Sequence, residues 1–167
     1  MNPHSRKERK ISEFLLKNSN GISVKILSFG GIIQEINIPD KNGFSENVVL
    51  SYINPKDYIK DNLYMGALIG RYANRISKSS FELNEETLKL TKNEGENHLH
   101  GGNKGFHNVN WSFDEKNIKE DSLTLTHFSE NYDNGYPGNL NVSVKYTLSN
   151  RNILDIEFYA ISDRDTI

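Results

Sequence analysis

The stretch LNVSVKYTL at residues 140–148 alternates apolar and polar side chains without a break. A second alternating run, ILDIEFYA, follows at residues 153–160, and the four residues between them, Ser-Asn-Arg-Asn, have the composition of a turn. Alternation with a period of two places all the apolar side chains of a strand on one face. The two runs therefore predict long antiparallel strands that pair as a hairpin and pack one face against another layer.

Shorter alternating runs fill much of the remaining chain. Residues 22–26 and 32–38 predict two strands on either side of a turn at residues 29–31, as a hairpin or meander. Further strands are expected from residue 48, as a tight hairpin over residues 81–83 and 88–90, from residue 111, and over residues 123–128. One helical turn is expected, with Asn54 as its N-cap and Pro55 at its first position. Many short strands without a fixed repeat predict an all-β, antiparallel β-sandwich.

Length and composition limit the possible functions. The chain has 167 residues, enough for one domain with its own core, and eight Tyr and eight Phe to fill it. A net charge of −2 gives no general attraction for nucleic acid, and the lack of cysteine excludes disulfides, thiolate metal sites and a cysteine nucleophile. The basic run at residues 6–10 is interpreted as a solvated leader. No signal-peptide core or bilayer-length apolar run is present, which predicts a soluble, cytoplasmic protein without a membrane partner.

Glycines, arginines and histidines converge between residues 66 and 111. Arg71 and Arg75 flank an apolar, glycine-rich segment, where a guanidinium group requires acceptors or a ligand. Downstream, His98 and His100 precede the pair Gly101-Gly102, which allows a close backbone approach or a turn. This region is the expected functional site.

A metal site is one alternative for the histidines. On a strand, His98 and His100 would share a face, and His107 could add a third ligand. No carboxylate follows the pair, so a metal is not expected, and His4, His107 and His127 are interpreted as solvated or structural. The acidic residues of the turn-rich segments are interpreted as surface groups rather than a glycosidase-like pair; they are Glu85, Glu86, Glu94 and Glu96. The Gly- and Pro-containing segment 132–138 is interpreted as a fixed loop.

Two segments resemble the aldose 1-epimerases, the galactose mutarotases: GALIGRYANRI at residues 66–76 and FELNEETLKLTKNEGENHLHGGNKGFHNVNW at residues 81–111. The motifs IPDKNG, VVLSY and GYPGNLNVSVKYTLSNRNILDIEFYA extend the resemblance from about residue 22 to the C-terminus. The resemblance implies a galactose mutarotase-like supersandwich. Residues 1–20 would then form a leader and the first strand, and residues 21–167 the N-terminal part of a single β-sandwich domain that is incomplete at its C-terminal end.

The resemblance also implies a site and a reaction. In this family the residues matching Asn74, Arg75 and His100 contact the hydroxyls and ring oxygen of a small aldose, while Arg71 and His98 would be structural neighbours. The reaction is an isomerisation of α and β anomers of hexoses such as galactose or glucose by acid–base ring opening. No metal or cofactor is implied.

The family's catalytic acid, a histidine, and its base, a glutamate, would both lie beyond Ile167. The resemblance therefore implies that this chain is the N-terminal portion of a longer enzyme, carries no catalytic residue of its own, and is inactive in isolation. It could associate with the missing C-terminal half. A non-catalytic carbohydrate-binding module and one half of a split enzyme are the alternatives.

Overall fold

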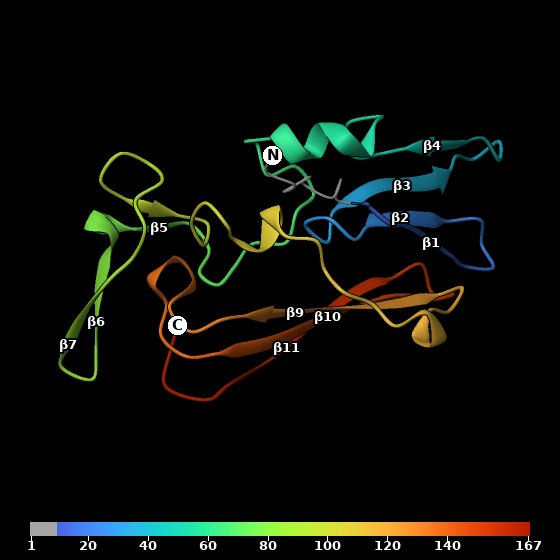
Figure 1. The fold of residues 1–167 in the computed structure, drawn as a ribbon. Coiled ribbons are helices and arrows are strands. Elements are labelled where there is room, and N and C mark those ends of the chain that lie inside the picture. The colour runs from blue at the N-terminus through green and yellow to red at the C-terminus, as the bar shows by residue number, and fades with distance from the viewer. Residues whose placement is uncertain (1–9) are drawn as a thin grey trace, which may run out of the picture.

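The two largest sheets of the computed structural model, which describes residues 10–167, are both antiparallel (Figure 1). The first sheet has the order β1-β2-β3-β4 and the second the order β11-β10-β9. Strands of the first sheet are β1 (Glu13–Lys17), β2 (Ser23–Leu27), β3 (Ile33–Pro39) and β4 (Ser45–Asn47). Strands of the second sheet are β9 (Ser122–Ser129), β10 (Leu140–Leu148) and β11 (Leu154–Ser162).

The two sheets stack face to face, and the main hydrophobic core lies between them (Figure 1). The first sheet contributes Phe14, Leu16, Val24 and Ile26, and the second contributes Leu123, Leu125, Val142, Val144 and Tyr146. In β10 every second residue is buried, so its inward face is continuous along the strand. The antiparallel β-sandwich that the alternation predicts is therefore confirmed.

The predicted hairpin of the two long runs is also confirmed. Strands β10 and β11 pair antiparallel with Val144 opposite Phe158 and Leu148 opposite Leu154. The second strand begins at Leu154 rather than at residue 153, because the Ile153 carbonyl accepts a hydrogen bond from the Ser149 backbone N–H and so closes the turn.

Smaller elements connect the two sheets. A second hairpin, β6 (Ser80–Leu83) with β7 (Glu86–Lys89), turns at Asn84 and Glu85, both of which have positive φ, as a two-residue hairpin turn requires.

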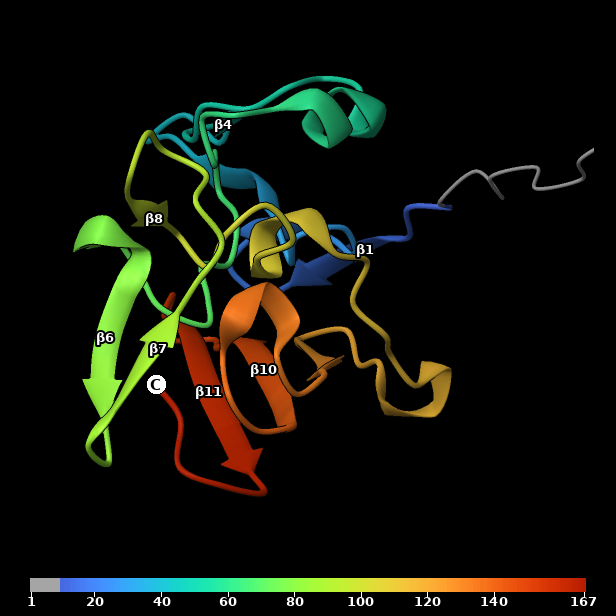
Figure 2. The ribbon, with the colours of Figure 1, turned by 60° about the vertical axis from the view of Figure 1, so that its left-hand side comes forward.

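The expected helical turn is the 3₁₀ helix Pro55–Lys60, whose N-terminus is capped by the Asn54 side chain. Four further single turns of 3₁₀ helix were not expected; they are Ser77–Ser79, Phe106–Asn108, Glu115–Asn117 and Asp133–Gly135. The C-terminal segment runs between the β6–β7 hairpin and β11 (Figure 2).

The strand expected from residue 48 lies earlier in the chain, at Ser45–Asn47. Strand β4 ends at Asn47, whose side-chain oxygen accepts hydrogen bonds from the backbone N–H groups of Ile36 and Val49. This side chain takes the place of a ladder partner, so the chain leaves the sheet. Val48 and Leu50 are consequently 60% and 80% exposed despite their β-branched or apolar character.

The strand expected from residue 111 is reduced to one bridge between Ser112 and Thr126. Trp111 is buried, and its indole N–H donates to the Phe106 carbonyl, while its backbone N–H donates to the Ser28 carbonyl. These contacts fix Trp111 in the core between the two sheets, where it is not part of a strand.

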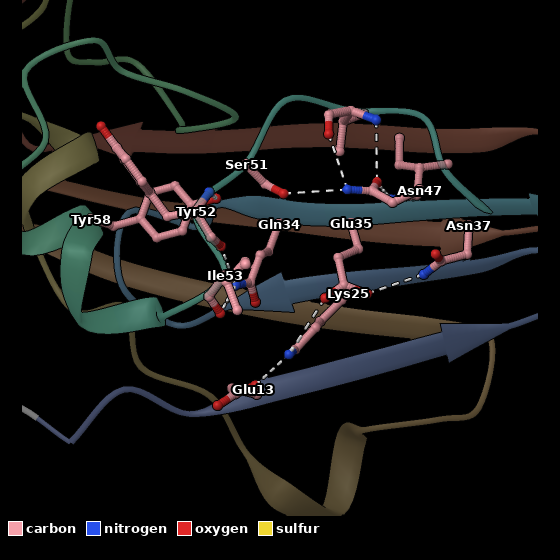
Figure 3. A network of polar contacts seen from close by, with 12 residues as sticks. Glu13, Lys25, Gln34, Glu35, Asn37, Asn47, Ser51, Tyr52, Ile53 and Tyr58 are labelled. Atoms are coloured by element: carbon pink, nitrogen blue, oxygen red, sulfur yellow. Dashed lines mark hydrogen bonds and ion pairs between the residues drawn. The ribbon is translucent and has the colours of Figure 1, made fainter.

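The long connection after β4 is fixed to the first sheet by a buried glutamine (Figure 3). Gln34 on β3 donates from Nε2 to the carbonyls of Tyr52 and Ile53, at 2.8 and 3.2 Å. On the same sheet, Lys25 bonds to Glu13 at 2.7 Å. The segment that leads to residues 66–111, which contain the candidate site, is thus held against a strand of the sandwich. No helix within residues 10–167 has the length and apolar character needed to cross a membrane.

Replacing Tyr146 by phenylalanine should lower the free energy of unfolding by about 1–2 kcal/mol. The Tyr146 hydroxyl is buried and donates to the Gly31 carbonyl at 2.6 Å, so its loss leaves a buried acceptor unpaired. Urea unfolding measures the change, and Tyr159→Phe, at a side chain that is 64% exposed, is the matched control. Equal stability of the two variants would contradict the assigned hydrogen bond.

Candidate functional site

A two-stranded ladder brings the three expected site residues together. Strand β5 (Arg75–Ile76) pairs with β8 (His98–Leu99), which places Asn74 and His100 side by side at one end of the ladder. The Asn74 backbone N–H donates to Nδ1 of His100 at 3.0 Å, and the His100 N–H donates to the Asn74 carbonyl at 3.0 Å. Arg75 Nη1 donates to Asn74 Oδ1 at 3.2 Å. Asn74, Arg75 and His100 therefore form one contact group.

The hydrogen bond to His100 decides which of its nitrogens can serve a ligand. Because Nδ1 accepts from a backbone N–H, the proton of the neutral ring lies on Nε2. Burial and the neighbouring Arg75 charge lower the pKa of His100, partly offset by Glu94. The imidazole is therefore neutral near pH 7 and offers Nε2 as a hydrogen-bond donor.

Glu94, interpreted from sequence as a surface group, is instead bonded to the site arginine. Its two carboxylate oxygens accept from Nε and Nη2 of Arg75 at 2.6 and 2.5 Å. The hydrogen bonds from Arg75 lower the pKa of Glu94 below its usual range. Arg75 itself is exposed rather than buried, so this pairing and Asn74, more than burial, fix its guanidinium group.

Arg71 is the arginine that lies inside the fold. Its guanidinium group donates to the carbonyl oxygens of Ser129, Glu130, Pro137 and Gly138 and to the hydroxyl of Ser129. These acceptors belong to the segment that joins β9 to β10. Arg71 thus holds the predicted fixed loop, in agreement with a structural role.

The structure does not arrange His98 and His100 as the metal alternative requires. Strand β8 ends at Leu99, and His100 has a positive φ, so the two histidines are not arranged as alternate residues of one strand. His98 is fully buried, and its ring contacts the Thr91 carbonyl and the Tyr136 hydroxyl, each at 2.7 Å. Both ring nitrogens are thereby engaged. Residues 10–167 contain no group of three or more His, Cys, Asp or Glu side chains placed to hold a metal ion.

The expected close backbone approach at Gly101 is confirmed. A Cβ atom at this position would lie 1.6 Å from the Gly70 carbonyl oxygen, and the residue has a φ of +81°. Only glycine fits there. The loop after His100 is thereby packed against the segment that leads to Asn74.

One ring near the site was missed by sequence reasoning. Tyr64 packs edge-on against His100, with ring centroids 4.8 Å apart, and against His107, at 4.7 Å. No alternation or motif marks this tyrosine, because it lies in an irregular connection. Its contacts restrict the orientation of the His100 ring.

Comparison with known structures defines the fold class first. The chain superposes on an aldose epimerase homologue from C. elegans with a TM-score of 0.87 and 30% identity, covering 92% of this chain and 47% of that one. For a galactose 1-epimerase from Lactobacillus acidophilus NCFM the TM-score is 0.83 and the identity 34%, covering 98% and 48%. The fold is that of the galactose mutarotases.

Sequence comparison then defines the family. The model of the aldose 1-epimerase family matches residues 12–167, and the chain belongs to this family. It is 38% identical over 152 residues to an aldose 1-epimerase from Streptococcus thermophilus, a match that covers 90% of this chain and 43% of the relative. The chain spans less than half the length of the relatives it matches.

Stability should fall by about 1–2 kcal/mol between pH 7 and pH 5 through His107 alone. Burial lowers the pKa of His107 to about 4, whereas an unfolded histidine titrates near 6.5. Between these values the unfolded chain binds more protons, so the free energy of unfolding decreases as the pH falls. Urea unfolding at both pH values, for the wild type and His107→Asn, tests this expectation. The variant should lose part of the pH dependence, and an unchanged difference would contradict the assignment.

Proposed function

We propose that this chain provides the sugar-binding part of an aldose 1-epimerase, which interconverts the α and β anomers of hexoses such as galactose or glucose. The observation that supports this proposal most directly is the contact group of Asn74, Arg75 and His100. An arginine and a neutral histidine supply directional donors that suit the hydroxyls and ring oxygen of an aldose. Family membership supplies the reaction class.

The proposed reaction requires two proton transfers. A base removes the proton from the C1 hydroxyl while an acid protonates the ring oxygen, and the bond between C1 and the ring oxygen breaks to give the open aldehyde. Rotation about the bond between C1 and C2, followed by the reverse steps, closes the ring on the other face. His100 Nε2–H, Arg75 and Asn74 would hold the sugar in position during both transfers.

The described carboxylate at this site is poorly suited to act as the base. Glu94 is bound through both oxygens to Arg75, and its pKa is lowered, so it holds a proton weakly. We therefore infer that residues 1–167 alone bind the sugar but do not turn it over efficiently. The family resemblance assigns the acid and the base to a histidine and a glutamate outside these residues.

A face of the second sheet supports association with the other half of the fold. Ile156, Phe158 and Ala160 on β11 lie on the same face as the buried residues of β10, but they are exposed, Phe158 to 59%. An uncovered apolar sheet face beside an unpaired strand edge favours association. We propose that a segment equivalent to the C-terminal half of the relatives covers it.

A carbohydrate-binding module without catalysis is the second candidate, and the engagement of Glu94 by Arg75 favours it for the isolated chain. Binding alone does not distinguish the two functions, whereas turnover after addition of a C-terminal half does.

Galactose should bind to the isolated chain, and Arg75→Ala or His100→Ala should weaken binding by about tenfold or more, because each removes charged or directional hydrogen bonds. Ligand-observed NMR with galactose measures the affinity. Arg151→Ala, in the exposed turn between β10 and β11, is the matched control and should bind as the wild type does. Unchanged affinity in both site variants would refute the proposed sugar site.

Mutarotation should be slow with the isolated chain and rise by about 10²-fold or more when the unmatched C-terminal part of the Streptococcus thermophilus relative is added. Polarimetry on freshly dissolved α-galactose measures the rate. Phe158→Asp should prevent this gain, because it places a charge on the face to be covered. Tyr159→Asp, which changes an exposed ring on the opposite face, is the control. Full activity of the isolated chain would overturn the expectation that it lacks the catalytic pair.

A further inference from the structure

The bonds around Arg75 leave one part of its guanidinium group for a ligand. Nε and Nη2 donate to the two oxygens of Glu94, and Nη1 donates to Asn74 Oδ1. An arginine side chain has five N–H donors. These three bonds fix the plane of the group and leave two donors outside the contacts that residues 10–167 make.

Glu94 is itself held in place by a built loop. Asn93 donates from Nδ2 to the Leu99 carbonyl and accepts from the Leu99 N–H at 2.7 Å, which ties the loop to β8. The backbones of Glu94 and Asn97 exchange hydrogen bonds at 3.1 and 2.9 Å. Glu94 therefore starts from a tight turn that is anchored to the strand ending beside His100.

The charges of the site cancel. Arg75 carries one positive charge, Glu94 one negative charge at hydrogen-bond distance, and His100 is neutral near pH 7. An anionic ligand at the free edge of Arg75 would be attracted by the guanidinium group and repelled by the adjacent carboxylate, and the two effects largely cancel. A neutral sugar can use both groups, because a hydroxyl can accept from Arg75 and donate to Glu94.

We propose that Glu94 is a positioning and specificity-determining residue that orients Arg75 and removes the preference for uronic acids and aldose phosphates that an unpaired Arg75 would give. The inference rests on the proposed function, since it requires the sugar to contact Arg75.

The test compares galactose, galacturonate and galactose 6-phosphate as ligands of the isolated chain and of Glu94→Gln, by ligand-observed NMR. Removing the carboxylate charge should raise the affinity for both anions by about fivefold relative to galactose. The gain should shrink between about 0.05 and about 0.5 M salt, because it arises from a partly exposed charge. A purely structural effect of the substitution would not depend on salt in this way.

Three further variants make the result specific. Glu96→Gln, two residues away on an exposed side chain paired with Lys92, should change nothing. The double variant Arg75→Gln with Glu94→Gln should not show the increased relative affinity for the anionic sugars, because no charge remains at either position. If Glu94→Gln does not fold, Arg75→Gln provides the converse test: the unpaired carboxylate should make the anions bind still worse relative to galactose.

The possible outcomes separate the two proposals. Galactose binding by the wild type, with an unchanged or salt-independent ratio in Glu94→Gln, would overturn the role of Glu94 and leave the proposed function standing. Tighter binding of galacturonate or galactose 6-phosphate than of galactose by the wild type would also overturn the role of Glu94. Absence of binding of every sugar to the wild type would refute the proposed function itself, and the inference would fall with it.

Discussion

The half-buried guanidinium group of Arg71 is the interaction on which the arrangement of the functional region depends. A buried charge is tolerated only where acceptors surround it, and here backbone carbonyls from the β9–β10 connection supply them. Thr166 adds a longer contact near the C-terminus. Arg71 lies three positions before Asn74, so one side chain fixes the loop of the second sheet to the start of the segment that carries Asn74 and Arg75.

The site itself combines the neutral imidazole of His100 with the oppositely charged side chains of Arg75 and Glu94. His100 is kept neutral by burial and by the Arg75 charge, and its orientation is set by the Asn74 N–H and the Tyr64 ring. Arg75, although exposed, is held by Glu94. The polar groups are therefore oriented before any ligand arrives, which reduces the entropy lost on binding.

Alternation along the sequence was sufficient to predict the sandwich and the β10–β11 hairpin, because burial on one face of a strand imposes a period of two. It failed where side chains replaced ladder partners, as Asn47 does, or where a large ring filled the core, as Trp111 does. Arg75 and His100 were singled out from the glycine-rich segments around them, and the family resemblance added Asn74 and the proposed contact with a sugar. Glu94 was missed because a carboxylate in a turn-rich segment has the pattern of a surface group, and its pairing depends on the long-range β5–β8 register.

The contact between Gly101 and the Gly70 carbonyl has a genetic consequence. Every codon for glycine is one nucleotide change away from codons for residues with a side chain, and each of them would place a Cβ atom inside that carbonyl. Every single-nucleotide change that replaces Gly101 is therefore expected to be harmful. Substitution should be tolerated more easily at the exposed side chains of the candidate site than at this glycine, so the backbone of the site should change more slowly in evolution than its side chains.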